Sequence, residues 1–268
     1  MIARMGAREA TVTKPEQREQ WERDGYLIVE DTGIDEATIE RAIADTKDLY
    51  EEDEFGERWG TVEDGDIGVF YTSHRVMDAW RISENVKKIA LAPRLLAIAE
   101  ELHGRKPRPF QTLTFPFGTQ QKAHSDTIHF DSVPPDYMLG IWVALEDMDM
   151  DNGPVYYYPG SQKLPRVTVA TIGAEAVPAE YPKYEQYIEQ VIEREGLEPE
   201  YALIKKGQAF LWAANLLHGG APRRDLSRSR QSQVTHVFFE DCRYFMPLMS
   251  SDLGTEEGTH WREPDWIQ

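Results

Sequence analysis

The feature that most constrains the fold is the stretch QKAHSDTIHFD, which holds two overlapping copies of one metal-binding pattern. In a strand, residues two apart project to the same face, so either His124 with Asp126 or His129 with Asp131 would direct an imidazole and a carboxylate to one point. A third candidate ligand, His218, lies far downstream. If these residues form one site, the fold must bring two distant segments together.

An isolated His-x-Asp triplet favours a polar surface loop over a metal site. The sequence around His218 therefore decides between these two interpretations. There the chain reads FLWAANLLHGGAPRRDLSRSRQSQVTHVFFE, an apolar run that ends on His218, a turn, and a second apolar strand. Arg230 and Ser232 lie two apart at the entry to that strand, so in a strand they share a face. A guanidinium beside a hydroxyl suits the far carboxylate of a small dicarboxylic acid. Two histidines and one carboxylate on one face of an octahedron are typical of non-haem Fe(II) oxygenases.

The order of the motifs carries a resemblance to a known family. His124-x-Asp126 is followed by GIWVALED, which contains Trp142, and then by DNGPVYYYPGS, His218 and Arg230. With the N-terminal phrase WERDGYLIVED, the chain resembles the phytanoyl-CoA dioxygenase family of Fe(II)/2-oxoglutarate oxygenases over nearly its whole length. The resemblance implies a mainly β protein with flanking helices, whose core is a double-stranded β-helix (a cupin-like jelly roll) with the metal inside the barrel.

The resemblance also implies roles for single residues. It assigns His124, Asp126 and His218 as the Fe(II) ligands, because the family's first histidine precedes the aromatic-bearing strand by about the separation seen here. The keto acid end of 2-oxoglutarate would chelate the metal, Arg230 assisted by Ser232 would hold its other carboxylate, and O2 would take the last position. The default outcome is hydroxylation of an unactivated C–H bond of a small molecule, with release of succinate and CO2.

Further residues are predicted to line the same pocket. Gln111 shares a strand face with Leu113 and Phe115, which should turn it inward toward the cosubstrate, although an edge glutamine that satisfies a neighbouring backbone group fits equally well. Trp142 is placed beside the cosubstrate. The candidates for substrate contact are His129, Asp131, Tyr158 and Trp212. The remaining histidines are predicted not to be ligands, although His236 follows Arg230 into the same strand and could face the barrel interior.

Charge and composition narrow the class of protein. A net charge of -18 without a sustained run of Lys or Arg argues against a nucleic-acid or anionic-membrane partner. The single cysteine, Cys242, excludes an internal disulfide framework and a Cys-rich zinc site, so a reducing cytoplasm is the expected location. No stretch approaches a membrane-spanning length. We expect a cytoplasmic enzyme whose partner is a small-molecule substrate.

The chain is long enough for one large domain, which is the expected organisation. Its predicted parts are a loose arm (1–12), a mainly helical scaffold (13–104), the jelly-roll core (105–240) with an insertion (163–205), and a C-terminal tail (241–268). The insertion contains a predicted amphipathic helix between Tyr181 and Arg194. This insertion and the loops near residues 67–80 are expected to cover the mouth of the active site as a lid.

Local signals place the helices of the scaffold. The segment from Thr13 to Glu16 fits a capping box with proline in the first turn, and that helix should stop at Gly25. Asp35 is predicted to cap the next helix. A third helical segment, residues 83–104, should be broken or kinked at Pro93. The acidic stretch 51–66 is predicted to be a solvent-facing loop.

Two alternative functions stay open on the sequence. A zinc hydrolase could use the same three ligands, but the pair of Arg230 and Ser232 would then be unexplained. A cupin-type enzyme that does not use 2-oxoglutarate is the second. A catalytically inactive binding module would lack a ligand or the arginine, and all are present. Because Asp126 fills the carboxylate position, a halogenase is disfavoured, whereas desaturation and ring formation stay open.

Overall fold

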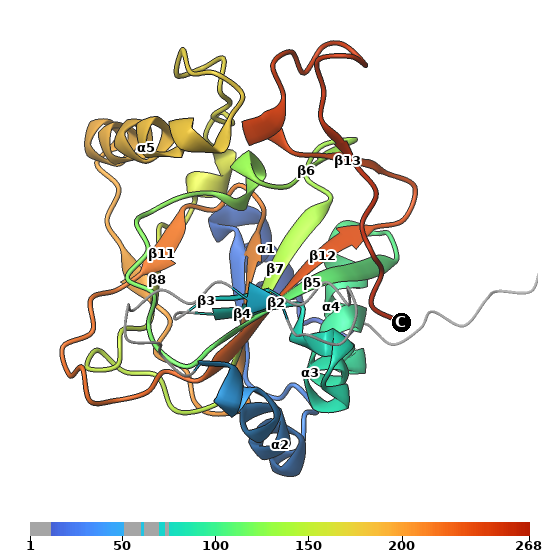
Figure 1. Ribbon diagram of the computed structural model, residues 1–268, viewed down its shortest axis with the longest axis vertical. Coiled ribbons are helices and arrows are strands. Elements are labelled where there is room, and N and C mark those ends of the chain that lie inside the picture. Colours follow the sequence, from blue (N-terminus) through green and yellow to red (C-terminus); the bar gives the residue numbers. More distant parts are fainter. Residues whose placement is uncertain (1–11, 51–59, 62–69, 73–74) are drawn as a thin grey trace, which may run out of the picture.

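The structure is a computed structural model that describes residues 12–50, 60–61, 70–72 and 75–268. The predicted arm (apart from its last residue), nearly all of the predicted acidic loop and His74 lie outside the described residues. Figure 1 shows strands at the centre of the molecule and helices around them. The described part is therefore mainly β with flanking helices, as predicted.

Antiparallel pairing builds all of the described sheets. The main sheet has the strand order β1-β10-β7-β12-β5-β4-β3-β2, and two three-stranded sheets have the orders β11-β8-β9 and β14-β13-β6. The strands of the main sheet are β1 (Tyr26–Val29), β10 (Ala209–Ala213), β7 (Met138–Ala144), β12 (Ser232–Phe239), β5 (Pro107–Phe115), β4 (Arg75–Met77), β3 (Phe70–Thr72) and β2 (Gly60–Thr61). Those of the small sheets are β11 (His218–Gly220), β8 (Val155–Tyr157), β9 (Glu200–Tyr201), β14 (Trp261–Arg262), β13 (Arg243–Phe245) and β6 (Asp131–Val133).

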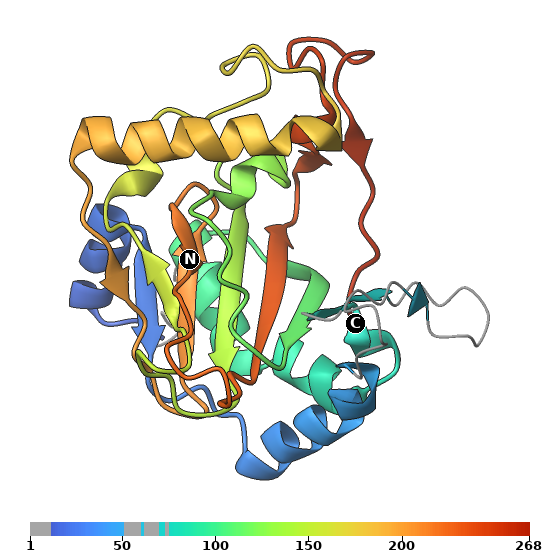
Figure 2. The same cartoon turned by 60° about the vertical axis from the view of Figure 1, so that its left-hand side comes forward.

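Five α-helices surround the sheets in the described part of the chain. They are α1 (Pro15–Asp24), α2 (Glu36–Thr46), α3 (Glu84–Ala90), α4 (Pro93–His103) and α5 (Tyr181–Glu195). Short 3-10 turns lie at Lys47–Tyr50, Ala79–Arg81, Asp126–Ile128, Ser161–Lys163, Pro178–Glu180 and Pro247–Met249. In both views α5 lies across one end of the strands and α2 near the other, and the C-terminal segment, in red, passes the end that α5 covers (Figure 2). No helix among the residues described has the length and apolar character needed to cross a membrane.

Alternation along the central strands divides the core into two layers. In β7, Leu139, Ile141 and Val143 pack with α2, α3 and α4 on the outer face of the main sheet. Trp142 and Ala144 point the other way, into a second cluster that also contains Tyr157 of the small sheet. Because both faces of β7 are covered, the strand is apolar almost throughout. The second cluster lies between the two sheets, on the side where the predicted site residues gather.

The helix signals are partly confirmed. Gly25 ends α1 in the left-handed conformation, and Asp35 caps α2 by accepting a hydrogen bond from the Thr38 N–H. The predicted capping box is wrong in its register, since the cap of α1 is Lys14, whose N–H donates to the Gln17 side chain. The third helical segment is two helices, because the chain leaves the helix at Ala90 and restarts at Pro93. The helix predicted in the insertion is α5.

The strand predicted for the His-x-Asp triplet is wrong. His124 makes only an isolated antiparallel bridge to His218, and Asp126 begins a 3-10 turn. The two side chains nevertheless meet, because the turn folds Asp126 back toward His124. Arg230 likewise lies just before β12, although its N–H donates to the Pro116 carbonyl and so continues the pairing with the neighbouring segment.

Candidate active site

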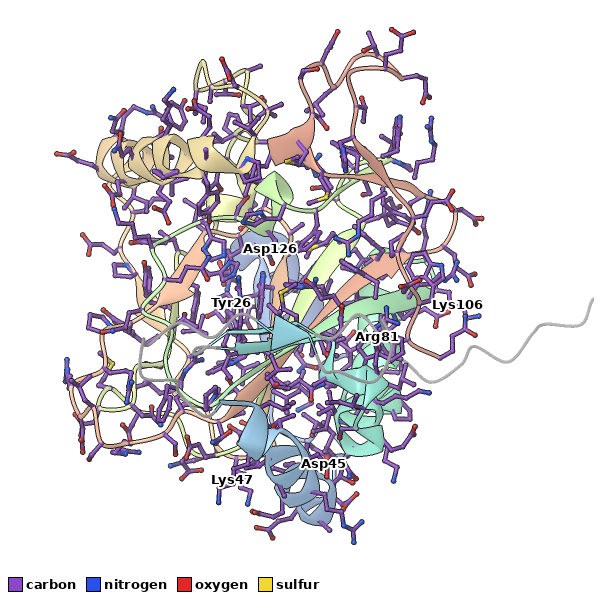
Figure 3. The ribbon with its side chains drawn as sticks, in the orientation of Figure 1. Tyr26, Asp45, Lys47, Arg81, Lys106 and Asp126 are labelled. Carbon is purple, nitrogen blue, oxygen red and sulfur yellow. The ribbon has the colours of Figure 1, made fainter. Side chains whose placement is uncertain are left out.

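His124, Asp126 and His218 lie together inside the barrel. One ligand atom from each lies within 4.8 Å of the others, and all three side chains are buried. The Nε2 atoms of both histidines are 3.9 Å from Oδ1 of Asp126. Figure 3 shows Asp126 near the middle of the molecule. Two nitrogen donors and one carboxylate oxygen at this spacing form a facial set of metal ligands.

Backbone hydrogen bonds set the orientation of both imidazoles. The N–H of each histidine donates to the carbonyl of the other, which locks His124 beside His218. Nδ1 of His124 lies 2.9 Å from the Lys122 carbonyl, and Nδ1 of His218 lies 3.0 Å from that of Leu216. A carbonyl only accepts, so Nδ1 carries the proton and Nε2 presents its lone pair to the centre of the site. Burial lowers the pKa of His124 to about 3 and that of His218 to about 4, so both rings are neutral at pH 7.

The carboxylate of Asp126 is fixed by an indole. Nε1 of Trp212 donates to Oδ2 of Asp126 at 2.7 Å, which leaves Oδ1 facing the two histidines. The Trp212 ring also packs on His218, with 4.7 Å between ring centroids. Gly140 makes room for the indole, because a Cβ there would lie 2.2 Å from the Trp212 ring. Trp212 was predicted as a substrate contact, and the structure places it in the cavity wall as the partner of Asp126.

His236 lies beside the triad, although the sequence predicted no ligand role for it. Its Nε2 is 3.8 Å from Oδ2 of Asp126, and its Nδ1 is 3.0 Å from the amide oxygen of Gln111. Gln111 thus points inward, which is one of the two placements left open by the sequence, and its amide oxygen accepts the Nδ1 proton of His236. Burial lowers the pKa of His236 to about 4. The alternation along the strand could have predicted this position, because residues two apart, such as Val234 and His236, share a face. Both side chains line the cavity.

Arg230 stands at one end of the cavity, almost completely buried at 3% exposure. Its guanidinium carbon is 5.6 Å from the Phe115 ring centroid and 5.4 Å from that of Trp142, and Nη2 donates to the Phe117 carbonyl. Burial lowers its pKa to about 10. No carboxylate among the described residues lies within ion-pair distance of it, so this buried cation is free to pair with an anion in the cavity.

The polar atoms around Arg230 support the same conclusion. Nε of Arg230, Oγ of Ser232 and Nε1 of Trp142 are buried and find no acceptor among the residues the structure describes. Ser232 shares a strand face with Val234 and His236, which line the cavity, but Ser232 itself is fully buried and is not part of the lining. A carboxylate between these groups would accept several hydrogen bonds, so the residues fit the far carboxylate of 2-oxoglutarate.

The cavity that joins these groups has a volume of about 620 Å³. Its lining contains the triad, Gln111, Trp142, Trp212, Arg230 and His236, together with His129. The insertion contributes Pro178 and Tyr181, and the C-terminal segment contributes Met246, Leu248 and Arg262. The insertion and the described end of residues 67–80, which were predicted to cover the site, therefore form part of its wall, and their role as a lid stays a prediction. The C-terminal segment was predicted only as a tail, so its part in the wall was not foreseen.

Two of the four substrate candidates lie elsewhere. Asp131 forms an ion pair with Arg166 at 3.3 Å and accepts a hydrogen bond from the Ser132 N–H. Tyr158 packs in an apolar cluster under α5. Neither belongs to the cavity lining. For Asp131, the 3-10 turn Asp126–Ile128 breaks the simple alternation that the prediction assumed. Tyr158 follows Tyr157 at the end of β8 and packs in a different cluster from Tyr157. His129 does line the cavity, with its ring 5.0 Å from that of Tyr181.

Comparison with known proteins agrees with the geometry. Residues 21–231 match the family model described as Phytanoyl-CoA dioxygenase (PhyH). The peroxisomal phytanoyl-CoA dioxygenase of Rattus norvegicus is 22% identical over 246 residues, which are 85% of this chain and 69% of the relative.

Solved structures share the fold at low sequence identity. The non-heme alpha ketoglutarate dependent carbocyclase SnoK from nogalamycin biosynthesis is 15% identical with a TM-score of 0.67, covering 89% of this chain and 90% of its own. The epimerase SnoN of the same biosynthesis is 20% identical with a TM-score of 0.63 over 94% and 98% of the two chains. EctD from S. alaskensis with 2-oxoglutarate and 5-hydroxyectoine is 18% identical with a TM-score of 0.60 over 90% and 81%. The predicted cupin-like jelly roll is confirmed, and the chain belongs to the phytanoyl-CoA dioxygenase family of iron- and 2-oxoglutarate-dependent oxygenases.

Proposed function

We propose that the chain hydroxylates an unactivated C–H bond of a small molecule, with conversion of 2-oxoglutarate and O2 to succinate and CO2. The observation that carries the proposal is a single cavity holding both a facial His-Asp-His set and a buried guanidinium without a carboxylate partner among the described residues. Bound iron would supply the oxidising chemistry, and the protein would supply coordination, orientation and exclusion of water.

Each residue of the cavity then has a defined task. His124, Asp126 and His218 hold the iron through Nε2, Oδ1 and Nε2. Arg230 and Ser232 bind the far carboxylate of 2-oxoglutarate, and Trp142, whose ring centroid lies 5.4 Å from the Arg230 guanidinium carbon, has an Nε1 donor without an acceptor among the described residues. Gln111 lines the cavity, and its amide oxygen accepts a hydrogen bond from His236, so we assign it a positioning role.

The alternatives explain fewer of these observations. A zinc hydrolase, or a cupin-type enzyme that ignores 2-oxoglutarate, would use the triad but would leave a buried cation and three unmatched donors without purpose. Hydroxylation is the default outcome, whereas desaturation and ring formation stay open, because similar folds include proteins described as a carbocyclase and an epimerase. The titles of solved structures also name small molecules as bound ligands, namely nogalamycin RO and 5-hydroxyectoine. We propose a small-molecule substrate here as well.

Anaerobic titration of Fe(II)-loaded protein with 2-oxoglutarate tests the assignment. A visible charge-transfer band should appear, disappear in His124→Ala, and require much more 2-oxoglutarate in Arg230→Met. His129→Ala is the matched control, since His129 lines the same cavity outside the triad, and it should keep the band. Absence of the band in the wild type would refute the cofactor assignment. A band that survives His124→Ala but is lost in His129→Ala would show that the other register supplies the ligands.

A further inference from the structure

The cavity continues past the triad, away from Arg230. In the register of β12 with β5, Ser232 pairs with Phe115 and His236 pairs with Gln111. Arg230 lies beyond the Ser232 end of this pairing. The opposite direction leads past His236 to the aromatic rings of Phe110 and Phe130, whose centroids are 6.1 Å and 5.1 Å from that of His236. The cavity thus has two ends, with the triad between them.

A second guanidinium occupies the far end. Arg262, in β14, lines the cavity, and its guanidinium carbon is 5.2 Å from the ring centroids of both Phe110 and Phe130. The pairing of β14 with β13, through Tyr244, holds this part of the C-terminal segment in place. Burial lowers the pKa of Arg262, which marks a cation that is incompletely solvated.

The carboxylates that act on Arg262 are engaged with other groups. Asp78 accepts hydrogen bonds from the Thr112 N–H at 3.0 Å and from Trp80 Nε1 at 3.2 Å. Asp265 forms an ion pair with Arg81 at 2.6 Å. No carboxylate of the described residues lies within ion-pair distance of Arg262. Its hydrogen-bonding edge is therefore available to a molecule in the cavity.

The walls near Arg262 define the rest of the ligand. Met77, Phe130, Met246 and Leu248 add apolar surface to the cavity that contains both Arg262 and the triad, and the Phe130 ring lies 5.2 Å from the Arg262 guanidinium carbon. An apolar wall with one charged group at its end fits a molecule with an apolar body and one anionic head. Such a molecule would place a carbon remote from its head group beside the metal ligands.

We propose that Arg262 binds the carboxylate of the substrate, and that the substrate is a small monocarboxylic acid oxidised at a carbon away from its acid group. This inference rests on the proposed function, because it assumes that His124, Asp126 and His218 hold the oxidising iron in the same cavity. A guanidinium recognises a carboxylate through two parallel hydrogen bonds, which gives both orientation and selectivity over a neutral amide.

The test compares matched acids and amides on the anaerobic protein with Fe(II) and excess 2-oxoglutarate, which keeps acids away from Arg230. Octanoate, octanamide and octyl phosphate are titrated while tryptophan fluorescence is followed, because Trp142 and Trp212 line the cavity. Octanoate should bind at least about tenfold more tightly than octanamide. Arg262→Met should remove that preference, and Arg262→Lys should keep part of it.

Arg243→Met is the matched control, since Arg243 belongs to the same C-terminal segment but pairs with Glu256 at the surface. It should keep the full preference. Three results would overturn the inference: equal binding of acid and amide, no binding of octanoate, or a preference for the acid that survives Arg262→Met. Tighter binding of octyl phosphate than of octanoate would overturn the choice of a monoanion. The charge-transfer band distinguishes a failure of this inference from a failure of the cofactor assignment. A normal band without acid preference refutes only this inference, whereas absence of the band refutes the cofactor assignment.

Discussion

Replacing Trp212 with phenylalanine should weaken metal binding without removing a metal ligand. The substitution keeps an aromatic ring against His218 but deletes the Nε1–H that donates to Oδ2 of Asp126 at 2.7 Å. A hydrogen bond to a charged group contributes about 1.5–3 kcal/mol, and loss of such an outer partner costs roughly 10- to 100-fold in metal affinity. These two estimates agree, because each factor of ten corresponds to about 1.4 kcal/mol. We therefore expect the Kd for Fe(II) to rise by one to two orders of magnitude.

Competition between the protein and a chelator of known affinity measures that Kd under anaerobic conditions. Trp142→Phe is the matched control, because Trp142 is a buried cavity tryptophan whose Nε1 faces the Arg230 end of the cavity. This control should keep the metal affinity and weaken 2-oxoglutarate binding. Thermal unfolding of both metal-free variants shows whether either is globally destabilised. If Trp212→Phe binds Fe(II) within twofold of the wild type, the indole does not position Asp126 and the argument fails.

Three further predictions concern the cosubstrate, the packing and the pH dependence. Arg230→Met should raise the Kd for 2-oxoglutarate by about two orders of magnitude, because a buried charge-assisted contact is lost. The affinity for the metal should change only a fewfold. Titration of the charge-transfer band measures the Kd for 2-oxoglutarate. Gly140→Ala should lower the free energy of unfolding by about 1–3 kcal/mol in urea titrations, since the new Cβ would lie 2.2 Å from the Trp212 ring. Burial lowers the pKa of His103 to about 4, so the unfolded chain takes up a proton near pH 6.5 that the folded chain refuses until about pH 4. Neutral His103 therefore costs the folded chain nothing above pH 6.5, and its effect lowers the free energy of unfolding as the pH falls from 6.5 toward 4. In urea titrations between pH 6.5 and 4.5, His103→Phe should reduce the slope of the free energy of unfolding against pH by about 1.4 kcal/mol per pH unit. An unchanged slope would contradict this.

Alternation along apolar strands was enough to predict one wall of the site. Gln111 could be placed inside the barrel because Leu113 and Phe115 share its face, and the structure shows all three in the cavity lining. The same rule also orients His236, because Val234 shares its face and both side chains line the cavity. At this position the alternation along the strand is a stronger signal than the general tendency of lone histidines to be structural.

The other wall could not be predicted from local patterns. His124 and His218 meet through mutual backbone hydrogen bonds between segments far apart in the chain, and Asp126 reaches them from a 3-10 turn. Asp131, two residues from His129, leaves the cavity because that turn changes which side the chain presents. Arg262 carries no strand signal, since β14 spans only Trp261–Arg262 and is defined by its pairing with β13. These positions depend on long-range pairing, which no window of sequence contains.

The two walls also differ in what they control. The groups proposed to hold 2-oxoglutarate and to support the triad lie on the long central strands or next to them, where Arg230, Gln111 and His236 are fixed by the main sheet. The proposed substrate end is built from shorter pieces, namely the start of α5 with Tyr181 and the C-terminal segment with Arg262. Loops and short elements accept substitutions at a lower energetic cost than a buried sheet. Changes in the insertion or in the C-terminal segment can therefore alter which acid is bound while the iron and 2-oxoglutarate sites stay intact.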